Sequence, residues 1–577
     1  MKRTRFLHYA RILAAGTIVG AIGGFGAIGF RWLIIFFDRI FFETIPGQFP
    51  IVESWWIIVA PALGGALVGP IVTFLAKETR GSGIPEVMEA IFTTGGKIRA
   101  RVAPLRALAS SILAGSGGSV GREGPIVQIG SAVSSLVAQL LKLKRTEMRV
   151  LVACGAAAGI SATFNSPLAG AFFAHEVVLM NFSADTFFPV VVSSVVASII
   201  GYAAFGSEPT FRIPEYSIET FTEMPLFLLL GVVLAVAGVI FTRLLYSVES
   251  LFKRSHIPAY LAPAAGGLAV GLIAYFDPRV LGIGYDIIGD FLRQEYVVIG
   301  SVILLALLKI LATSLSIGSG GSGGLVAPSL FLGAAIGGAL GQAANAWGAM
   351  TTPSAYALVG MGGAFAATSH APITSVLTVF ELTRDYNMML PLMLTCGVST
   401  IAARVIYRFS IFNLQLVRHG VHYSLTEDTR LLDQVTVQEA MVTDVITVAP
   451  DTTVAEASHL FDESKHHGFP VADADDTLHG IVTLEDVRKA LENDMQDATV
   501  QEAGTHELVV AFPDESLNDA LRKLGLRDIG RLPVVDRDDH TKLLGLVTRK
   551  NIIAAYNRAL IRRHTHLRDT VQSEHIE

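Results

Sequence analysis

The chain contains very little cysteine: its only two, Cys154 and Cys396, both lie inside apolar runs. Two such thiols cannot build a disulfide framework or a metal cluster, so we interpret both as small buried packing residues. The sequence also lacks a Walker loop, a HExxH pattern and any Cys/His spacing typical of metal sites. These absences argue against an ATP-driven pump or a membrane enzyme, and we expect neither enzymatic activity nor a metal site.

Charged residues are scarce as well. Asp, Glu, Lys and Arg make up 16% of the 577 residues, whereas hydrophobic residues make up 51%, and the mean hydropathy is +0.52. This composition is typical of a chain with several membrane-spanning helices. The scarcity ends near residue 425, after which charged residues are dense. The sequence therefore predicts a membrane part followed by a soluble part, and the formal net charge of −6 gives no support to a nucleic-acid partner.

The apolar segments of the membrane part fall into two sets. Some are long enough to span with tilt, but several are short and interrupted by glycine or proline. Short interrupted segments predict helices that stop inside the membrane, with irregular backbone lining a cavity. The segments lie near 10–40, 55–77, 103–114, 125–142, 148–163, 167–180 and 186–206, and near 224–249, 258–276, 296–316, 328–347, 354–367, 371–383 and 388–408.

Basic residues, namely Lys2, Arg3 and Arg5, precede the first apolar segment. That segment is too long for the apolar region of a signal peptide. It therefore predicts a retained first helix whose basic end lies in the cytoplasm.

A glycine-rich stretch, residues 115–125 (GSGGSVGREGP), lies between two apolar runs. Glycine at this density lets backbone N–H groups turn toward one point and form an anion-binding concavity. We expect a helix to begin with the apolar run from Ile126, which would add the positive end of its dipole. A carboxylate at Glu123 would then occupy the same electrostatic well as a mobile anion.

The same pattern recurs at residues 318–328 (GSGGSGGLVAP), at an offset of 203. Glu123 has Val326 as its equivalent, so the carboxylate is an addition that only one half carries. Residues 165–167 and Glu176 also correspond to residues 370–372 and Glu381, at an offset of 205. Two matched halves, about 10–206 and 224–408, predict a transport fold with its site at the repeat interface. We expect Glu176 and Glu381 to be buried structural hydrogen-bonding groups.

Two further segments complete the candidate site. Residues 81–86 (GSGIPE) place Gly and Ser donors just ahead of a helix start, and Ser410-Ile411-Phe412 follows the last apolar run. Donors of this kind suit an anion without requiring a cationic side chain. A halide held by partial charges can be bound firmly and still released.

The membrane part resembles the CLC family of chloride channels and proton-coupled chloride transporters. The motifs that carry the resemblance are GSGIP (81–85), GREGP (121–125), PLAG (167–170) and GGLVAP (323–328), over about residues 10–420. The resemblance implies an all-α polytopic membrane protein built from two inverted repeats with broken helices. It also implies a homodimer with one pore per subunit, embedded in the lipid of the inner or plasma membrane, and chloride as the transported ion.

The resemblance implies roles for individual residues. Ser82 supplies a hydroxyl to chloride, and Glu123 is the gating glutamate, whose carboxylate takes the outer anion site and swings away when protonated or displaced. The backbone amides near Leu325 and Val326 line the same pathway. The full set of residues expected to bind the anion is Ser82, Gly83, Ile84, Gly121, Arg122, Gly124, Leu325, Val326 and Phe412.

The chain departs from the family pattern at three positions. Val326 aligns with an aromatic residue of the third loop, so side-chain packing is lost while the backbone amide remains. Phe412 aligns with a tyrosine of many members and has no hydroxyl to offer chloride. Val177 aligns with the inner proton-transfer glutamate of the coupled transporters, where the family's channels tend to carry valine. Since valine cannot relay a proton, we expect passive conduction of the voltage-gated chloride channel type. Proton–chloride exchange is the alternative, and the neighbouring His175 is a candidate for delivering protons by another path.

The soluble part repeats too. Residues 436–440, 468–471 and 480–483 return as 499–503, 531–534 and 545–548. Each unit combines β-rich runs such as 445–448 with amphipathic helical ones such as 454–464. This pattern resembles a tandem pair of cystathionine-β-synthase (CBS) domains of the α/β class. The expected domains are the membrane domain at 1–425, CBS domains at 434–494 and 497–558 on the cytoplasmic side, and a polar tail at 559–577.

The CBS resemblance implies an adenine-nucleotide sensor. Thr483 and Asp486 fit a Thr-x-x-Asp pattern whose carboxylate accepts hydrogen bonds from ribose hydroxyls, and Thr548 and Asn551 form a weaker second copy. The alternative is a dimerisation platform without a ligand. No cofactor is required for the predicted transport.

Overall fold

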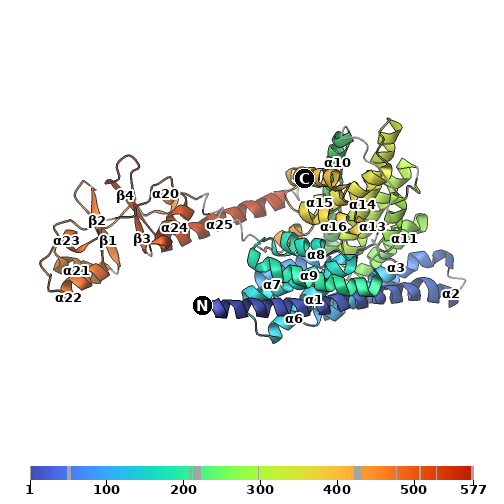
Figure 1. Cartoon of the computed structure of the whole chain (residues 1–577), viewed down its shortest axis with the longest axis horizontal. Coiled ribbons are helices and arrows are strands. Elements are labelled where there is room, and N and C mark those ends of the chain that lie inside the picture. The colour runs from blue at the N-terminus through green and yellow to red at the C-terminus, as the bar shows by residue number, and fades with distance from the viewer. Residues whose placement is uncertain are drawn as a thin grey trace. The chain divides into compact units, whose positions relative to one another are not determined.

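The computed structural model describes residues 2–48, 53–206, 211, 223–296, 298–421, 432, 435–464, 466–475, 477–505, 508–527 and 529–573 (Figure 1). The chain divides into two compact units, Met1–Tyr423 and Ser424–Glu577. The first unit is helical throughout its described part, whereas the second combines helices with short strands. The predicted fold class, an all-α membrane part followed by a small α/β part, is confirmed.

The first half of the helical unit alternates long apolar helices with shorter ones. Its helices are α1 (Lys2–Arg39), α2 (Ile45–Gln48), α3 (Glu53–Pro70), α4 (Ile84–Thr93), α5 (Val102–Gly115), α6 (Glu123–Leu140), α7 (Arg145–Phe164), α8 (Pro167–Phe173) and α9 (Ala184–Phe205). Wider or tighter turns extend some of them: η1 (Ile40–Thr44), η3 (Ile71–Leu75), η4 (Lys77–Thr79) and η5 (Ala174–Leu179).

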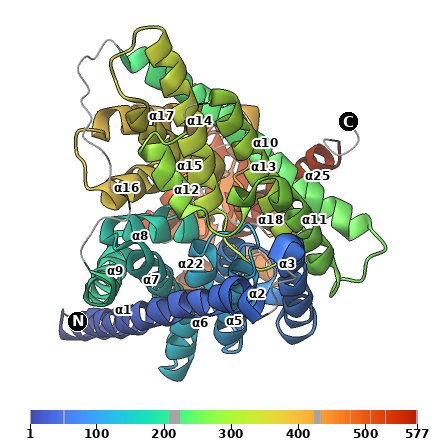
Figure 2. The same cartoon turned by 90° about the vertical axis from the view of Figure 1, so that its right-hand side faces the viewer.

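The second half repeats this succession. Its helices are α10 (Met224–Arg254), α11 (Ala262–Phe276), α12 (Tyr285–Leu292), α13 (Ile299–Gly318), α14 (Val326–Ala346), α15 (Pro353–Ser369), α16 (Pro372–Thr383), α17 (Met389–Ile406) and α18 (Asn413–Arg418), with the short turn η7 (Pro278–Val280). Equivalent pairs pack together in both halves: α6 on α7 and α14 on α15, then α1 on α9 and α10 on α17. Figure 2 shows α14 and α15 side by side in the second half.

Eight helical stretches in the described part of the chain are long and apolar enough to cross a membrane. Four more apolar helices are too short to cross, at 102–115, 167–179, 262–276 and 372–383. A short apolar helix buried among longer ones leaves its ends inside the protein, where its free backbone groups need partners. The predicted short apolar helices are therefore present, and their ending within the membrane stays a prediction.

Glu176 and Glu381 supply such partners across the two halves. Glu176 Oε2 accepts hydrogen bonds from the Thr374 backbone N and hydroxyl, both at 2.7 Å, at the start of α16. Glu381 in α16 accepts from the backbone N of Leu168 at 3.0 Å and of Ala169 at 2.7 Å, at the start of α8. Each half thus caps a helix of the other, as expected for two copies related by an approximate two-fold axis.

The helix after the first glycine loop begins earlier than predicted. We expected it from Ile126, but α6 begins at Glu123, and its counterpart α14 begins at Val326. Pro125 and Pro328 therefore lie within the first turn, where a missing N–H costs nothing because those groups have no acceptor inside the helix. As a result Glu123 is itself the first residue of the helix.

The second unit holds two similar halves. They are α20 (Val437–Ala440), α21 (Val454–Ser464), β1 (Gly468–Ala472), β2 (Leu478–Thr483) and α22 (Leu484–Glu492), then α23 (Val500–Ala503), α24 (Leu517–Leu526), β3 (Arg531–Val535), β4 (Leu543–Thr548) and α25 (Arg549–Ser573). Both strand pairs are antiparallel with the same register, since Gly468 faces Thr483 as Arg531 faces Thr548. The predicted helix at 454–464 is confirmed.

The predicted strand at 445–448 is wrong. Only Val448 forms a bridge there, parallel to Val471, and the residues before it are irregular. Each sheet has two strands, so a flanking β-rich segment touches its edge at one residue without extending it.

Tight packing of α14 on α15 gives a test of the fold. A Cβ added at Gly333 would lie 2.8 Å from the Met361 Cα, whereas one at Gly338 of the same helix would meet Ala357 Cβ at an ordinary 3.7 Å. Gly333→Ala should lower stability by about 1–3 kcal/mol because neither helix can move aside. Gly338→Ala, the matched control, should be neutral or slightly stabilising, since alanine favours helix. Thermal unfolding in detergent measures both, and equal melting temperatures would contradict the packing.

Candidate anion site

Three glycine loops meet in the middle of the first unit. Gly121 and Gly324 exchange backbone hydrogen bonds at 2.8 and 2.7 Å, and the Gly81 N–H donates to Gly321 O at 2.9 Å. The Gly323 N–H donates back to Gly81 O at 3.2 Å. The stretches 81–86, 115–125 and 318–328, which are far apart in the sequence, therefore form one connected site.

The first loop is fixed by a buried arginine. Arg106 of α5 donates to Thr79 O at 2.7 Å and to Gly81 O at 3.0 Å. Glu86 accepts from the Gly83 N–H at 2.8 Å and from the Gln415 side chain at 2.8 Å, which ties α4 to α18. Between these anchors Gly81 and Gly83 both have positive φ, +87° and +92°, which only glycine adopts readily.

Three helices begin at this junction. They are α4 at Ile84, α6 at Glu123 and α14 at Val326. The first N–H groups of a helix have no acceptor within it and carry the positive end of the helix dipole. The junction therefore attracts anions without contributing a cationic side chain. The predicted residues Gly83, Ile84, Gly121, Gly124, Leu325 and Val326 all belong to it.

Glu123 lies at this junction with its side chain 0% exposed. One carboxylate oxygen is 3.3 Å from the Ala327 N–H of α14, and the other accepts a hydrogen bond from the Tyr285 hydroxyl of α12. The carboxylate therefore uses a helix N-terminus of the opposite half as its partner. An anion bound at that N–H would have to displace it.

Sequence reasoning missed Tyr285. The signal that could have found it is Gly282-Ile283-Gly284 directly ahead of a short apolar run, one of several G-x-G patterns in the chain. Residues 282–284 share only their two glycines with residues 81–83, and two identical positions are too few to identify a repeat.

Arg122 does not pair with the neighbouring carboxylate. Its guanidinium lies 5.0 Å from the centre of the Tyr285 ring, and no ion pair with Glu123 occurs among the described residues. Arg122 therefore contributes to the site through the ring that holds Glu123.

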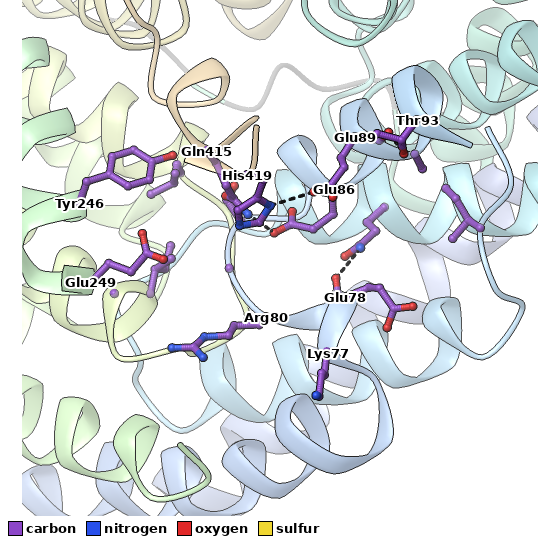
Figure 3. Close-up of a pocket in the computed structure, with 18 of the residues that line it drawn as sticks. Lys77, Glu78, Arg80, Glu86, Glu89, Thr93, Tyr246, Glu249, Gln415 and His419 are labelled. Atoms are coloured by element: carbon purple, nitrogen blue, oxygen red, sulfur yellow. Dashed lines mark hydrogen bonds and ion pairs between the residues drawn. The ribbon is translucent and has the colours of Figure 1, made fainter. Parts of the chain in front are cut away.

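Ser82 is one of the residues that line a cavity of about 590 Å³, and Figure 3 shows others of them, Arg80 and Glu86 included. The cavity is lined by α4, α10, α18 and residues 77–82, and it reaches Leu325 of the third loop. The Ser82 side chain is 3% exposed, and its hydroxyl has no hydrogen-bond partner among the described residues. A buried hydroxyl without a partner requires an explanation, and an acceptor arriving through the cavity supplies one.

The walls of the cavity carry nearly balanced charge. Figure 3 shows Glu86, Glu89, Glu249 and His419 around it. Lys253 pairs with Glu249 at 2.6 Å, and His419 lies 3.0 Å from Glu89. Lys77, Arg80 and Lys97 also line the cavity, and Arg99 there pairs with Glu78, so the charges of the wall nearly cancel.

Phe412 and Val177 take up positions beside this site. Phe412 is buried at the start of α18, which packs against α4, and Tyr246 donates to the adjacent Ile411 O at 2.7 Å. Val177 is buried in η5, which also packs against α4. His175 in the same turn has Nδ1 2.9 Å from Asn181 O, and its Nε2 has no partner among the described residues.

In the second unit, the predicted nucleotide residues are helix caps. The Asp486 carboxylate accepts from the Thr483 N–H at 3.0 Å and from its hydroxyl at 2.6 Å, and Asn551 receives the same two bonds from Thr548. A cleft of about 1200 Å³ adjoins Thr483, with Arg488, Arg527 and Arg531 among its basic lining residues. Asp486, Thr548 and Asn551 are not among the described residues that line it.

Spanning helices around a cavity that ends at helix N-termini define an integral membrane protein of the anion-transporting class. A family model described as "Voltage gated chloride channel" matches residues 64–404, and CBS domain models match 437–493 and 500–558. The chain therefore belongs to the CLC family of chloride channels and transporters, and it carries two CBS domains.

Known relatives include proteins of both transport types. The chain is 35% identical to "Putative chloride channel protein ClcB-like" of Ralstonia nicotianae, over 71% of this chain and 97% of the relative. It is 34% identical to "H(+)/Cl(-) exchange transporter ClcA" of Vibrio parahaemolyticus, over 70% and 89% of the two chains. A solved "slow cyanobacterial Cl-/H+ antiporter" has a TM-score of 0.65 at 26% identity, over 71% of this chain and 98% of that one.

Proposed function

We propose that the chain passes chloride through the junction of the three glycine loops. The observation that carries this proposal is the buried hydroxyl of Ser82, which lines the cavity and has no partner in the part of the chain that the structure describes. Chloride accepts hydrogen bonds, and the N–H groups that begin α4, α6 and α14 are the donors that a site of partial charges requires.

Glu123 acts as the gate in this proposal. Its carboxylate lies 3.3 Å from the Ala327 N–H, a donor that an anion in the pathway would use. Two negative charges cannot share one small buried site without a large energetic cost. Conduction therefore requires Glu123 to leave, either after protonation or by displacement.

Passive conduction is the mode that we favour, because Val177 is apolar and buried in η5. A carboxylate at that point could pass protons inward, whereas valine has no group that binds one. Exchange of chloride for protons is the second candidate. It is supported by the buried carboxylate of Glu123, which competes with the anion and itself carries a proton, and by the two relatives named for exchange.

Reversal potentials under opposed chloride and proton gradients distinguish the two modes. In planar bilayers or proteoliposomes, passive conduction should reverse at the chloride equilibrium potential whatever the proton gradient. A reversal potential that moves with the proton gradient would contradict passive conduction and establish exchange.

Glu123→Gln should make chloride flux insensitive to pH, because the amide imitates the protonated carboxyl group and cannot ionise. Glu456→Gln, at an exposed helix cap of the second unit, is the matched control and should retain the wild-type profile. Chloride efflux from liposomes between about pH 4 and 8, a range that spans the ordinary glutamate pKa, is the measurement. An unchanged pH profile in Glu123→Gln would remove Glu123 from the gate.

For the second unit, we propose an adenine nucleotide in the 1200 Å³ cleft. Thr483 would contact it, and the basic side chains of Arg488, Arg527 and Arg531 would face its phosphates. Asp486 already caps α22 and, in this arrangement, positions Thr483.

Calorimetric titration of the full chain with ATP, ADP and AMP tests this assignment. Arg488→Ala should weaken binding about tenfold, since a charge-assisted hydrogen bond to phosphate is lost. Arg522→Ala, on an exposed face outside the cleft lining, should bind as wild type does. Absence of binding at millimolar nucleotide would leave the CBS pair as a platform without a ligand.

We further propose a homodimer with one pathway per subunit, embedded in lipid, with the N-terminus and the CBS pair on the cytoplasmic side. The apolar side chains of Leu168, Ile199, Ile373 and Ile401 are exposed on α8, α9, α16 and α17, so they need a lipid or protein cover. Light scattering in detergent should give the mass of two subunits, and one subunit would contradict the dimer. Protease cleavage of the CBS pair in sealed, right-side-out vesicles would contradict the sidedness.

A further inference from the structure

The second half of the membrane unit contains its own copy of the Ser82 loop. Residues 282–285 lead into α12 as residues 81–84 lead into α4, at an offset of 201. Gly282 and Gly284 have positive φ, +61° and +85°, just as the two glycines of the first loop do. In addition, α12 packs on α14 as α4 packs on α6.

The copy includes the buried cation that fixes the loop. Lys309 of α13 donates to Val280 O at 2.9 Å and to Gly282 O at 2.8 Å. Arg106 of α5, at an offset of 203, donates to Thr79 O and Gly81 O, the equivalent carbonyls. Lys309 is 0% exposed and forms no ion pair among the described residues, so loop carbonyls are its partners.

The two loops present different groups to the anion site. The first leaves the Ser82 hydroxyl free at the cavity, whereas the second places Tyr285 at the first position of α12, with its hydroxyl donating to Glu123. The Tyr285 ring is held on several sides. Phe164 and Phe211 contact it edge-on, with ring centres 6.4 and 5.8 Å from the centre of the Tyr285 ring. The Arg122 guanidinium lies over the face of the ring.

We propose that Tyr285 is a latch that holds the gating carboxylate of Glu123 in the position that occludes the anion pathway, and that Lys309 is a positioning residue for this latch. The inference rests on the proposed function and deepens it by naming what sets the strength of the gate. A hydrogen bond from a neutral hydroxyl to a carboxylate stabilises the ionised, closed arrangement. Opening must break this bond together with the contact to Ala327.

Other charged or titratable groups adjoin Glu123 or hold the loops beside it, and all of them are present in Tyr285→Phe. They come from the loop before α6 and from elements packed near the site, and they are Arg122, Lys309, Arg106 and Glu86. Removing the Tyr285 hydroxyl leaves Lys309, Arg106 and Glu86 with their own partners, and the Arg122 guanidinium, which also bonds to the Tyr285 side chain, keeps the ring face beneath it.

The first test is the pH profile of chloride efflux from liposomes for Tyr285→Phe. Loss of the donor weakens the closed state, so the half-maximal pH should rise by about one unit, a tenfold change in proton concentration. The matched control is Tyr356→Phe, which removes another tyrosine-to-glutamate hydrogen bond, the one to Glu223 at 3.1 Å. The control should shift by less than about 0.3 unit, within the ordinary spread of a distant substitution.

The second test places Tyr285→Phe in the Glu123→Gln background. A latch acts only through the carboxylate, so the double variant should match the flux of Glu123→Gln alone within about twofold. An additional change of tenfold would show that Tyr285 acts on the pathway directly and would overturn the latch.

Lys309 is tested by two variants in the same assay. Lys309→Met should raise the half-maximal pH of chloride efflux as Tyr285→Phe does, because the loop carbonyls lose their donor. Lys309→Arg should keep the wild-type pH profile. Arginine serves the equivalent carbonyls in the first half, so it can make the same contacts. If Lys309→Met fails to fold, Lys309→Arg still decides, since a shifted profile in this variant would exclude the positioning role.

The inference and the proposed function fail differently. If wild-type chain passes no chloride, the proposed function is wrong. If wild-type flux depends on pH through Glu123 but Tyr285→Phe retains the wild-type profile, the gate stands and the latch is overturned.

Discussion

The whole membrane unit depends on one constraint: the first N–H groups of a helix need acceptors that the helix itself cannot supply, and a membrane interior offers no water in their place. The chain meets this need in two ways. Where a helix start is structural, a carboxylate from the opposite half caps it, as Glu176 and Glu381 do for α16 and α8. Where α4, α6 and α14 begin at the joined glycine loops, their free donors form the proposed chloride site.

Glu123 belongs to both categories at once. Its carboxylate contacts the Ala327 N–H as a structural cap would, yet the site around it is one that a chloride ion could fill. A carboxylate that competes with the ligand can act as a gate only if its hydrogen bonds can be broken. Glu176 differs from Glu123 in this respect, because several donors at the start of one helix bind its carboxylate. The difference between a structural carboxylate and a gate is therefore a difference in the number and origin of its hydrogen-bond donors.

Much of this arrangement was predictable from the sequence, because glycine density, proline placement and apolar length each have a direct backbone meaning. The repeat of residues 115–125 at 318–328 led to the site, and the positions of Glu176 and Glu381 led to their structural role. The loop at 282–285 was not predictable, because its offset is 201 while that of Lys309 from Arg106 is 203, so no single alignment superposes both. The start of α6 was misplaced because hydropathy marks the apolar run from Ile126, whereas the first turn of the helix already includes Glu123, Gly124 and Pro125. The run 445–448 was misassigned because β-propensity does not say whether a strand edge is available.

The hydrogen bond between Gln415 and Glu86 connects two distant parts of the membrane unit. Glu86 also holds the Gly83 N–H, so one carboxylate joins α18, the last helix of the membrane unit, to the loop that carries Ser82. The chain continues from α18 toward the CBS pair. One carboxylate therefore separates α18 from the backbone of the Ser82 loop, over two hydrogen bonds and with no membrane-spanning helix between them.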